Sequence, residues 1–271
     1  MKTLSVCVPA RDAGRALEPT LRSILDQDTD AEIIVLDNAS TDDTGVIAKS
    51  FDDKRVRVHR NVESLPLGEN WNKAISLSRG RFVKVVRPGD ILLPGALNRQ
   101  LEVMGDNGIA LCSAKFQIID DHGAVQATDL GLTNLLGRRD ARTLMRALIH
   151  RGPADFGPTS AAVFRRQDFD RVGGFRGNPG SPLDLDLFAR VCVFGHFYGM
   201  PETLTAQRDS DTTPSTAALT EMLRFHHRLG AEYPQYVGRA AVFGGDWRLA
   251  RAAADRVRGT AAARRRPEIS R

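Results

Sequence analysis

The sequence lacks the features that mark several large classes of protein. Its three cysteines, Cys7, Cys112 and Cys192, lie in apolar stretches, and their odd number and wide spacing fit neither a disulfide framework nor a metal site. No apolar run reaches the roughly 18 residues that a membrane-spanning helix needs, and no signal peptide opens the chain. We therefore expect a protein of the cytoplasm, where thiols stay reduced.

Lysine is scarce, and the positive charge is unevenly distributed. Only 6 of the 38 basic residues are lysines, a bias typical of GC-rich bacterial genes. Nine arginines and three acids lie within 238–271, so the remainder of a chain with a formal charge of +5 is nearly neutral. Because a nearly neutral body offers no basic face, we expect no nucleic-acid partner.

A glycine-rich phosphate loop is also missing. The apolar residues 4–8 predict a first buried strand, and Pro9 ends this pattern. The residues that follow, 9–14, lack the glycine pattern of dinucleotide-binding enzymes and the basic loop of nucleotidyltransferases. The sequence thus disfavours both classes.

The most informative stretch is 33–44. Its run of branched apolar residues stops at Asp37, and a cluster of Asn, Ser, Thr and Asp then opens a helical pattern. Ligands of parallel α/β sheets bind beyond the carboxyl ends of the strands, so we expect Asp37 to face a ligand crevice. Ser40, Thr41 and Asp42 are more simply explained as turn and N-cap residues.

Strands and helices alternate from the start of the chain, and this order predicts βαβ units and a parallel sheet. With 42% hydrophobic residues, 271 residues can form one large α/β domain. We place this domain at 1–210 and a helical extension with a basic tail at 211–271. Further strands are expected at 56–58, 82–86, 109–119 and 159–164. Helices are expected at 92–104 after Pro94, 141–149, 168–172, 216–229 and 239–263, and in two stretches around 71–77 and 187–194.

Several motifs, in order, resemble those of the family 2 glycosyltransferases. They are VPARD at 8–12, LRSILDQ at 21–27, IVLDNASTD at 34–42, GENWNKA at 68–74, GRFVK at 80–84, DILLP at 90–94, VFRR at 163–166, VGGF at 172–175 and LDLDLFAR at 183–190. Each is weak alone, but the ordered set is specific and covers about residues 3–208. The resemblance implies the GT-A fold, with a mostly parallel central sheet flanked by helices. It also implies inverting transfer of a sugar from a nucleotide sugar, UDP- or dTDP-linked, to an acceptor hydroxyl.

The resemblance assigns donor-binding roles by position. Asp37 takes the place of the acid that accepts from the ring imide of uracil or thymine, and Arg11 the place beside the base, where a guanidinium can stack. The other residues assigned to the nucleotide and its diphosphate are Pro9, Asn70, Asn72, Lys73 and Arg87.

The acidic motif that holds a divalent cation in this family is reduced here. After the fourth expected strand the chain reads Arg87-Pro88-Gly89-Asp90, so only the last acid remains. Asp90 can hold Mg²⁺ or Mn²⁺ when phosphates supply further oxygens, with Asp209 as a second ligand where the family often has Arg-x-His. Alternatively, Arg87 supplies the positive charge to the leaving diphosphate. Of the two, we expect the cation.

The catalytic base of the family is an acid at the start of the helix after a glycine-rich loop, and Asp184 occupies that position. Inverting transfer needs one carboxylate to take the proton of the acceptor hydroxyl. Asp186 is the second candidate, although a carboxylate in a first helical turn is also explained by the helix dipole.

The acceptor and the role of the tail stay open. The acceptor is a saccharide, a lipid-linked saccharide or a small natural product. The arginines of the tail alternate with apolar residues such as Phe243 and Trp247. This pattern is typical of a helix packed on the domain, but also of one that lies on an anionic membrane. The competing interpretation is that the chain is a glycosyltransferase-like protein that has lost catalysis and serves as a nucleotide-sugar-binding or scaffold protein.

Overall fold

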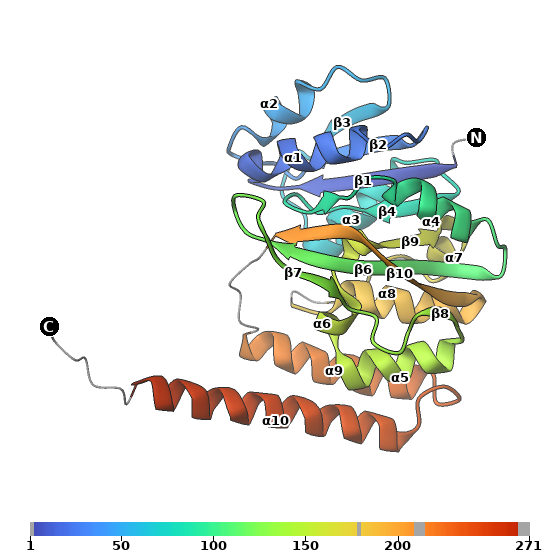
Figure 1. Cartoon of the computed structure of the whole chain (residues 1–271), viewed down its shortest axis with the longest axis vertical. Coiled ribbons are helices and arrows are strands. Elements are labelled where there is room, and N and C mark those ends of the chain that lie inside the picture. Colours follow the sequence, from blue (N-terminus) through green and yellow to red (C-terminus); the bar gives the residue numbers. More distant parts are fainter. Residues whose placement is uncertain (1–2, 178–179, 209–214, 265–271) are drawn as a thin grey trace, which may run out of the picture.

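A computed structural model describes residues 3–177, 180–208 and 215–264 (Figure 1). A single ten-stranded sheet runs through the molecule in the order β3-β2-β1-β4-β9-β6-β10-β5, and β7 and β8 pair with β6 and β10. The strands are β1 (Leu4–Ala10), β2 (Glu32–Asp37), β3 (Val56–Arg60), β4 (Phe82–Val85), β5 (Ile91–Leu92), β6 (Ile109–Ile119), β7 (Val125–Leu130), β8 (Gly137–Arg139), β9 (Ala162–Arg165) and β10 (His196–Arg208).

The first four strands of this order, β3-β2-β1-β4, are parallel, as are β6 and β10. β9 is antiparallel to both of its neighbours, β4 and β6. The expected α/β fold is therefore confirmed, and its sheet is mixed, because β5, β7 and β8 also pair in antiparallel fashion with β10, β6 and β10. Because β1, β2 and β4 run the same way, the residues that follow them meet at one edge of the sheet.

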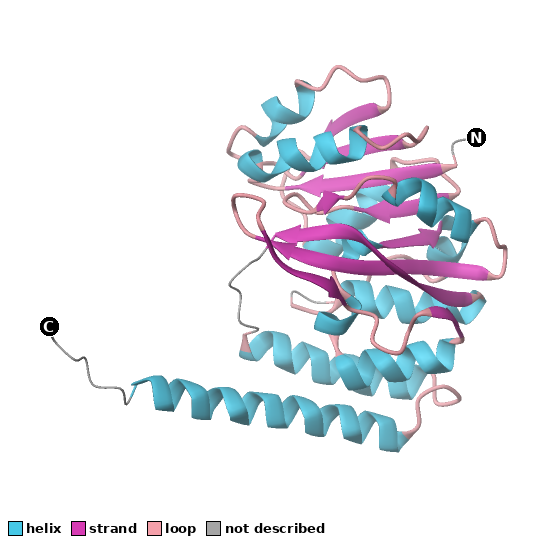
Figure 2. Cartoon of the chain, viewed as in Figure 1, coloured by secondary structure: helices cyan, strands magenta, loops and turns pink. Residues whose placement is uncertain are grey.

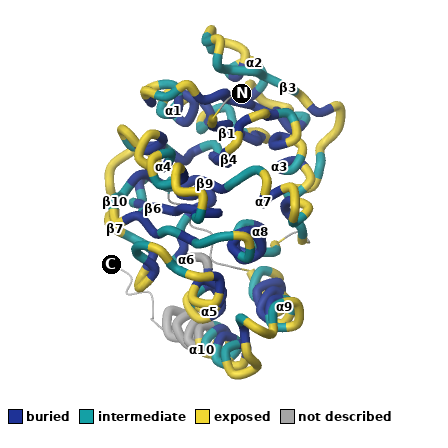
Figure 3. The backbone as a smooth tube through the Cα atoms, turned by 90° about the vertical axis from the view of Figure 1, so that its right-hand side faces the viewer, coloured by how far each residue is buried: buried dark blue, intermediate teal, exposed yellow. Residues whose placement is uncertain are grey.

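Helices cover both faces of the sheet (Figure 2). They are α1 (Gly14–Leu25), α2 (Thr44–Lys49), α3 (Leu67–Ser76), α4 (Ala96–Met104), α5 (Ala141–Arg151), α6 (Pro153–Phe156), α7 (Arg166–Arg171), α8 (Leu183–Val191), α9 (Thr216–Glu232) and α10 (Arg239–Arg264). Figure 3 shows the sheet between α1 and α4 on one side and α3, α7 and α8 on the other.

Two apolar clusters lie between these layers. Side chains alternate along a strand, so Val6 and Val8 of β1 join the cluster under α1 and α4, while Cys7 joins the other one. That second cluster continues from α3 and α8 through Met145 of α5 to Phe225 of α9. The two final helices thus share a core with the α/β body, and α9 and α10 lie beside α5 (Figures 1 and 3).

The structure differs from the expected elements mainly at their ends. The helix expected from residue 92 begins only at Ala96, after the short strand β5 and Gly95, whose φ is +76°. The strand expected at 159–164 begins as a 3-10 turn, Thr159–Ala161. The helix expected around 187–194 ends at Val191. The long strand β10 was not expected at all.

Candidate active site

A hollow of about 350 Å³ opens at the carboxyl edge of β1, β2 and β4. Its lining residues are Pro9, Ala10, Arg11, Ala13, Asn38, Leu65, Leu67, Asn70, Trp71, Arg87 and Pro88. We call it the edge hollow. It brings together four residues that the sequence assigned to the donor: Pro9, Arg11, Asn70 and Arg87. Trp71 and the leucines provide an apolar wall, and two arginines provide positive charge.

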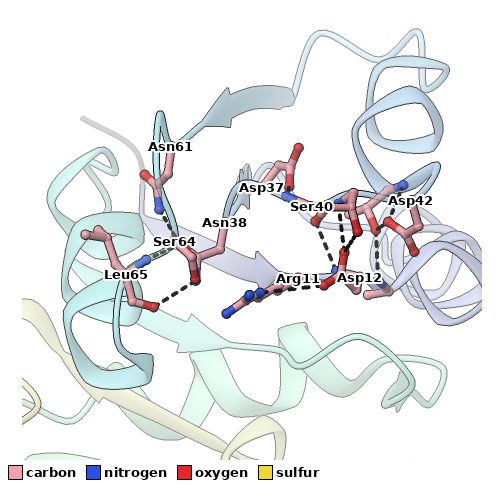
Figure 4. Close-up of polar contacts among 12 residues, drawn as sticks. Arg11, Asp12, Asp37, Asn38, Ser40, Asp42, Asn61, Ser64 and Leu65 are labelled. Carbon is pink, nitrogen blue, oxygen red and sulfur yellow. Dashed lines mark hydrogen bonds and ion pairs between the residues drawn. The ribbon is translucent and has the colours of Figure 1, made fainter.

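A network of asparagines forms one side of the edge hollow (Figure 4). Asn38 donates from Nδ2 to the carbonyl oxygen of Leu65 (2.9 Å), and its Oδ1 accepts from Leu65 N (2.9 Å) and Asn61 Nδ2 (2.7 Å). Asn61 Nδ2 also donates to Asn70 Oδ1 (3.0 Å). These bonds tie the end of β2 to the loop before α3 and to α3 itself. Asn38 and Asn61 were not predicted from the sequence, although the position of Asn38 directly after a strand was a signal.

Asp37 does not enter the edge hollow. Its Oδ1 accepts from Ser40 N (2.9 Å), its Oδ2 pairs with Arg60, and the residue is 1% exposed. Consecutive side chains of a strand point to opposite sides, so Asp37 turns away while Asn38 faces the hollow beside Arg11 (Figure 4). Asp37 lines instead a separate hollow of about 470 Å³ between α2 and β3.

The polar residues after β2 hold the loop that carries Arg11. Ser40, Asp42 and Thr44 accept hydrogen bonds from the backbone of this loop, and no side chain caps α2. The bonds run from Asp12 N to Ser40 Oγ (3.0 Å), from Ala13 N to Thr44 Oγ1 (2.8 Å) and from Gly14 N to Asp42 Oδ2 (2.9 Å). The N-cap explanation is therefore not supported, and the turn explanation is only part of their role, since these bonds also fix the backbone next to Arg11.

Asn72 and Lys73 are also outside the edge hollow. Asn72 accepts from Phe175 N (2.8 Å) and donates to Phe175 O (2.9 Å), so it holds the glycine-rich segment before α8. Gly174 has a φ of +76°, and a Cβ there would lie 2.6 Å from Asn72 Oδ1, so this close approach requires glycine. Lys73 is exposed on α3.

Arg87 and Asp90 follow β4 and contact each other. Arg87 Nε lies 3.4 Å from Asp90 Oδ2. Ser160 Oγ donates to the same carboxylate oxygen and accepts from Arg87 N (3.2 Å), which ties this loop to the segment before β9. Asp90 is 3% exposed, and burial raises its pKa even though the charge of Arg87 opposes this shift.

The described residues alone do not form a binding site for a divalent cation. They contain no group of three or more His, Cys, Asp or Glu side chains placed to hold a metal ion. Asp90 is buried and already pairs with a guanidinium and a hydroxyl. Asp209, the expected second ligand, lies outside the described residues.

A second hollow, of about 900 Å³, lies beside β6 and contains Asp184. We call it the β6 hollow; its lining includes Arg87, Phe116, Ile118, Leu130, Thr159 and Asp184. Thr159 Oγ1 donates to Asp184 Oδ2 (2.8 Å) and so orients this half-buried carboxylate. Arg87 lines both hollows and marks the place where they meet.

Asp186 has a different environment. It is 2% exposed and pairs with Arg176 (3.1 Å), Arg190 (2.7 Å) and Arg228 (3.2 Å). Arg228 belongs to α9, so the carboxylate joins this helix to α8. With three cationic partners and no place in the lining of the β6 hollow, Asp186 has the contacts of a structural residue.

Comparison with known proteins identifies the family. The sequence profile of glycosyl transferase family 2 matches residues 5–173. The chain is 29% identical over 226 residues to an uncharacterized protein of Mycobacterium tuberculosis, covering 80% of this chain and 70% of that one. It is 36% identical over 107 residues to GalNAc(5)-diNAcBac-PP-undecaprenol beta-1,3-glucosyltransferase of Campylobacter jejuni, covering 38% of this chain and 34% of that one.

Two solved structures have a similar fold. S. aureus TarS in complex with UDP-GlcNAc matches with a TM-score of 0.69 at 15% identity, over 92% of this chain and 71% of that one. The mannosyltransferase PcManGT from Pyrobaculum calidifontis, in complex with GDP-Man and Mn²⁺, matches with a TM-score of 0.62 at 17% identity, over 96% and 79%. Because the family profile covers more than half of the sequence, the chain belongs to glycosyl transferase family 2, and it has the GT-A fold.

Proposed function

We propose that the protein is an inverting glycosyltransferase that moves a sugar from a UDP- or dTDP-linked donor to an acceptor hydroxyl. The observation that carries this proposal is the position of Arg87, which lies between a hollow with base-stacking features and a second hollow that contains a carboxylate. A nucleotide in the edge hollow brings its diphosphate to Arg87 and its sugar into the β6 hollow. The complex of TarS with UDP-GlcNAc supports this class of donor.

The base in this reaction is Asp184. The acceptor oxygen attacks the anomeric carbon from the side opposite the diphosphate and gives its proton to the Asp184 carboxylate. The bond between the anomeric carbon and the phosphate oxygen breaks, and its electron pair leaves with the nucleoside diphosphate. Thr159 Oγ1 donates to Asp184 Oδ2 (2.8 Å) and Leu185 N donates to Oδ1 (2.9 Å), so both bonds orient the carboxylate. Each carboxylate oxygen keeps a second lone pair that can accept the proton.

On the donor side, we assign the base to the space between Arg11 and the apolar wall of the edge hollow. The Arg11 guanidinium is more than half exposed there and can stack on a planar ring. Asp37 does not contact the nucleotide itself. Its bonds to Arg60 and Ser40 hold the turn that carries Asn38, so Asp37 positions Asn38.

The acceptor binds in the β6 hollow. The outer surface of the protein favours an acceptor saccharide that is linked to a membrane lipid. No helix in the described ranges is long and apolar enough to cross a bilayer. On α10, however, Phe243 is 72% and Trp247 66% exposed, one helical turn apart, with Arg239 and Arg251 exposed on the same helix. We assign this aromatic and basic surface to contact with an anionic membrane. Further arginines of the expected basic tail, at 265–271, lie outside the described residues.

Flotation with anionic liposomes tests the membrane contact. The wild-type chain is expected to float at low salt and the double variant Phe243→Ser/Trp247→Ser to remain in the soluble fraction. No lipid-bound fraction of the wild type at low salt would refute the assignment.

The Asp184→Asn variant tests the catalytic assignment. It removes the proton acceptor but keeps the shape of the side chain, so donor binding should stay near the wild-type value while transfer falls by at least about 100-fold. A variant that keeps more than about a tenth of the wild-type turnover would show that the base lies elsewhere. The matched control is Asp155→Asn, because Asp155 lines the same hollow but pairs with Thr133 and Arg151.

A further inference from the structure

We propose that Arg87 takes the place of the divalent cation, so that the protein binds the donor and releases the diphosphate without a metal. This inference rests on the proposed function and deepens it. It also departs from our expectation from the sequence, in which Asp90 and Asp209 hold the metal.

The edge hollow has the charge of an anion site and not that of a cation site. Among its described lining residues none is an acid, whereas two, Arg11 and Arg87, are arginines. A Mg²⁺ or Mn²⁺ ion needs carboxylate or other oxygen ligands from the protein. A diphosphate needs positive charge and hydrogen-bond donors, which a planar guanidinium supplies to two phosphate oxygens at once.

Asp90, the one acid that remains of the family's acidic motif, already pairs with Arg87. The Asp90 side chain is 4% exposed, and Nε of the Arg87 side chain, which is 42% exposed, lies 3.4 Å from its Oδ2. A cation held by the Asp90 carboxylate would lie beside this guanidinium. Repulsion between the two positive charges, in a buried place of low dielectric, opposes such a site.

Arg87 is fixed before any ligand arrives. Asp90 holds its side chain, and Ser160 accepts from its backbone N (3.2 Å) while donating to Asp90. The guanidinium thus lies at the junction of the two hollows. This is the place where the bond between the sugar and the diphosphate breaks in the proposed reaction. As that bond breaks, the electron pair goes to the phosphate oxygen, and the fixed charge of Arg87 neutralises it.

Calorimetric titration of the full chain with UDP and dTDP, in EDTA and again in MnCl₂, tests the inference. The dissociation constant should agree within about twofold between the two conditions, and Arg87→Met should weaken binding by about tenfold or more, the scale of a charge-assisted pair. The matched control is Arg99→Met, since Arg99 pairs with Glu202 at 3.5 Å on another part of the surface. Arg87→Lys keeps the charge without the planar fork and is expected to fall between the two. Circular dichroism shows whether each variant is folded.

The outcomes separate this inference from the proposed function. Binding that EDTA weakens by about tenfold and MnCl₂ restores would overturn the inference and leave the glycosyltransferase proposal standing. Binding that Arg87→Met and Arg99→Met change equally, in folded variants, would also overturn it. If neither nucleotide binds under any condition, the proposed donor class is wrong, and the inference falls with it.

Discussion

A lysine beneath the site makes the stability of the protein depend on pH in a direction that can be calculated. Lys84 of β4 is completely buried, with its Nζ near Gln100 Oε1 (2.8 Å) and Ala162 O (3.5 Å). Burial lowers its pKa from 10.5 to about 7, although the nearby charge of Asp90 opposes the shift. The unfolded chain keeps the ordinary pKa, so above pH 7 it binds more protons than the folded chain.

The free energy of unfolding should therefore rise with pH once pH exceeds about 7. When the unfolded chain binds one proton more than the folded chain, the free energy of unfolding rises by about 1 kcal/mol for each pH unit. The three buried cysteines limit the range, because burial raises their pKa values well above 9 and makes stability fall again at higher pH. Between pH 7 and pH 8, before the cysteines of the unfolded chain ionise appreciably, the gain from Lys84 should amount to about 1 kcal/mol.

Urea unfolding at pH 7, 7.5 and 8 measures this slope below the range in which the cysteines contribute. Lys84→Met, which fills the same space without a charge, should remove it, whereas Lys54→Met, at an exposed lysine, should keep it. A flat wild-type profile, or a slope that survives in Lys84→Met, would show that Lys84 keeps its ordinary pKa and would refute the reasoning.

Two further predictions concern the residues around α8. Asp186→Asn leaves three arginines without their shared carboxylate and should lower the free energy of unfolding by about 3 kcal/mol. Asp184→Asn, measured by the same urea unfolding, should change it by less than about 1 kcal/mol, and equal losses in the two variants would contradict the distinction between them. Gly174→Ala should cost about 1–3 kcal/mol, since a side chain at φ +76° would also collide with Asn72; an unchanged melting temperature would argue against this contact.

The sequence predicted those parts of the fold that depend on local patterns. β6 lies at 109–119 as expected, because apolar residues recur along this stretch, first consecutively at 109–112 and then at alternate positions. β10 was missed because Gly199 and Pro201 interrupt its pattern, and its pairing with β6 shifts register along the strand. Long-range pairing with β6 decides this strand, and a local pattern does not contain that information.

The candidate site shows the same limit at single residues. Asp37 and Asn38 both follow the apolar run of β2, and no local pattern shows which of the two side chains points toward the edge hollow. Asp184 and Asp186 share one helical turn. Their environments differ only because Arg176, Arg190 and Arg228 converge on the second of them, one of these from a helix about 40 residues away.

A mass-spectrometric screen of nucleotide sugars, incubated with the wild-type chain and with Asp184→Asn in parallel, tests the central claim most directly. The account predicts that one UDP- or dTDP-sugar is retained by both proteins and that only the wild type consumes it and releases the nucleoside diphosphate. If neither protein retains any nucleotide sugar, the edge hollow is not a donor site. If a donor is retained but the wild type never consumes it, the chain binds nucleotide sugars without catalysis, and the account is contradicted.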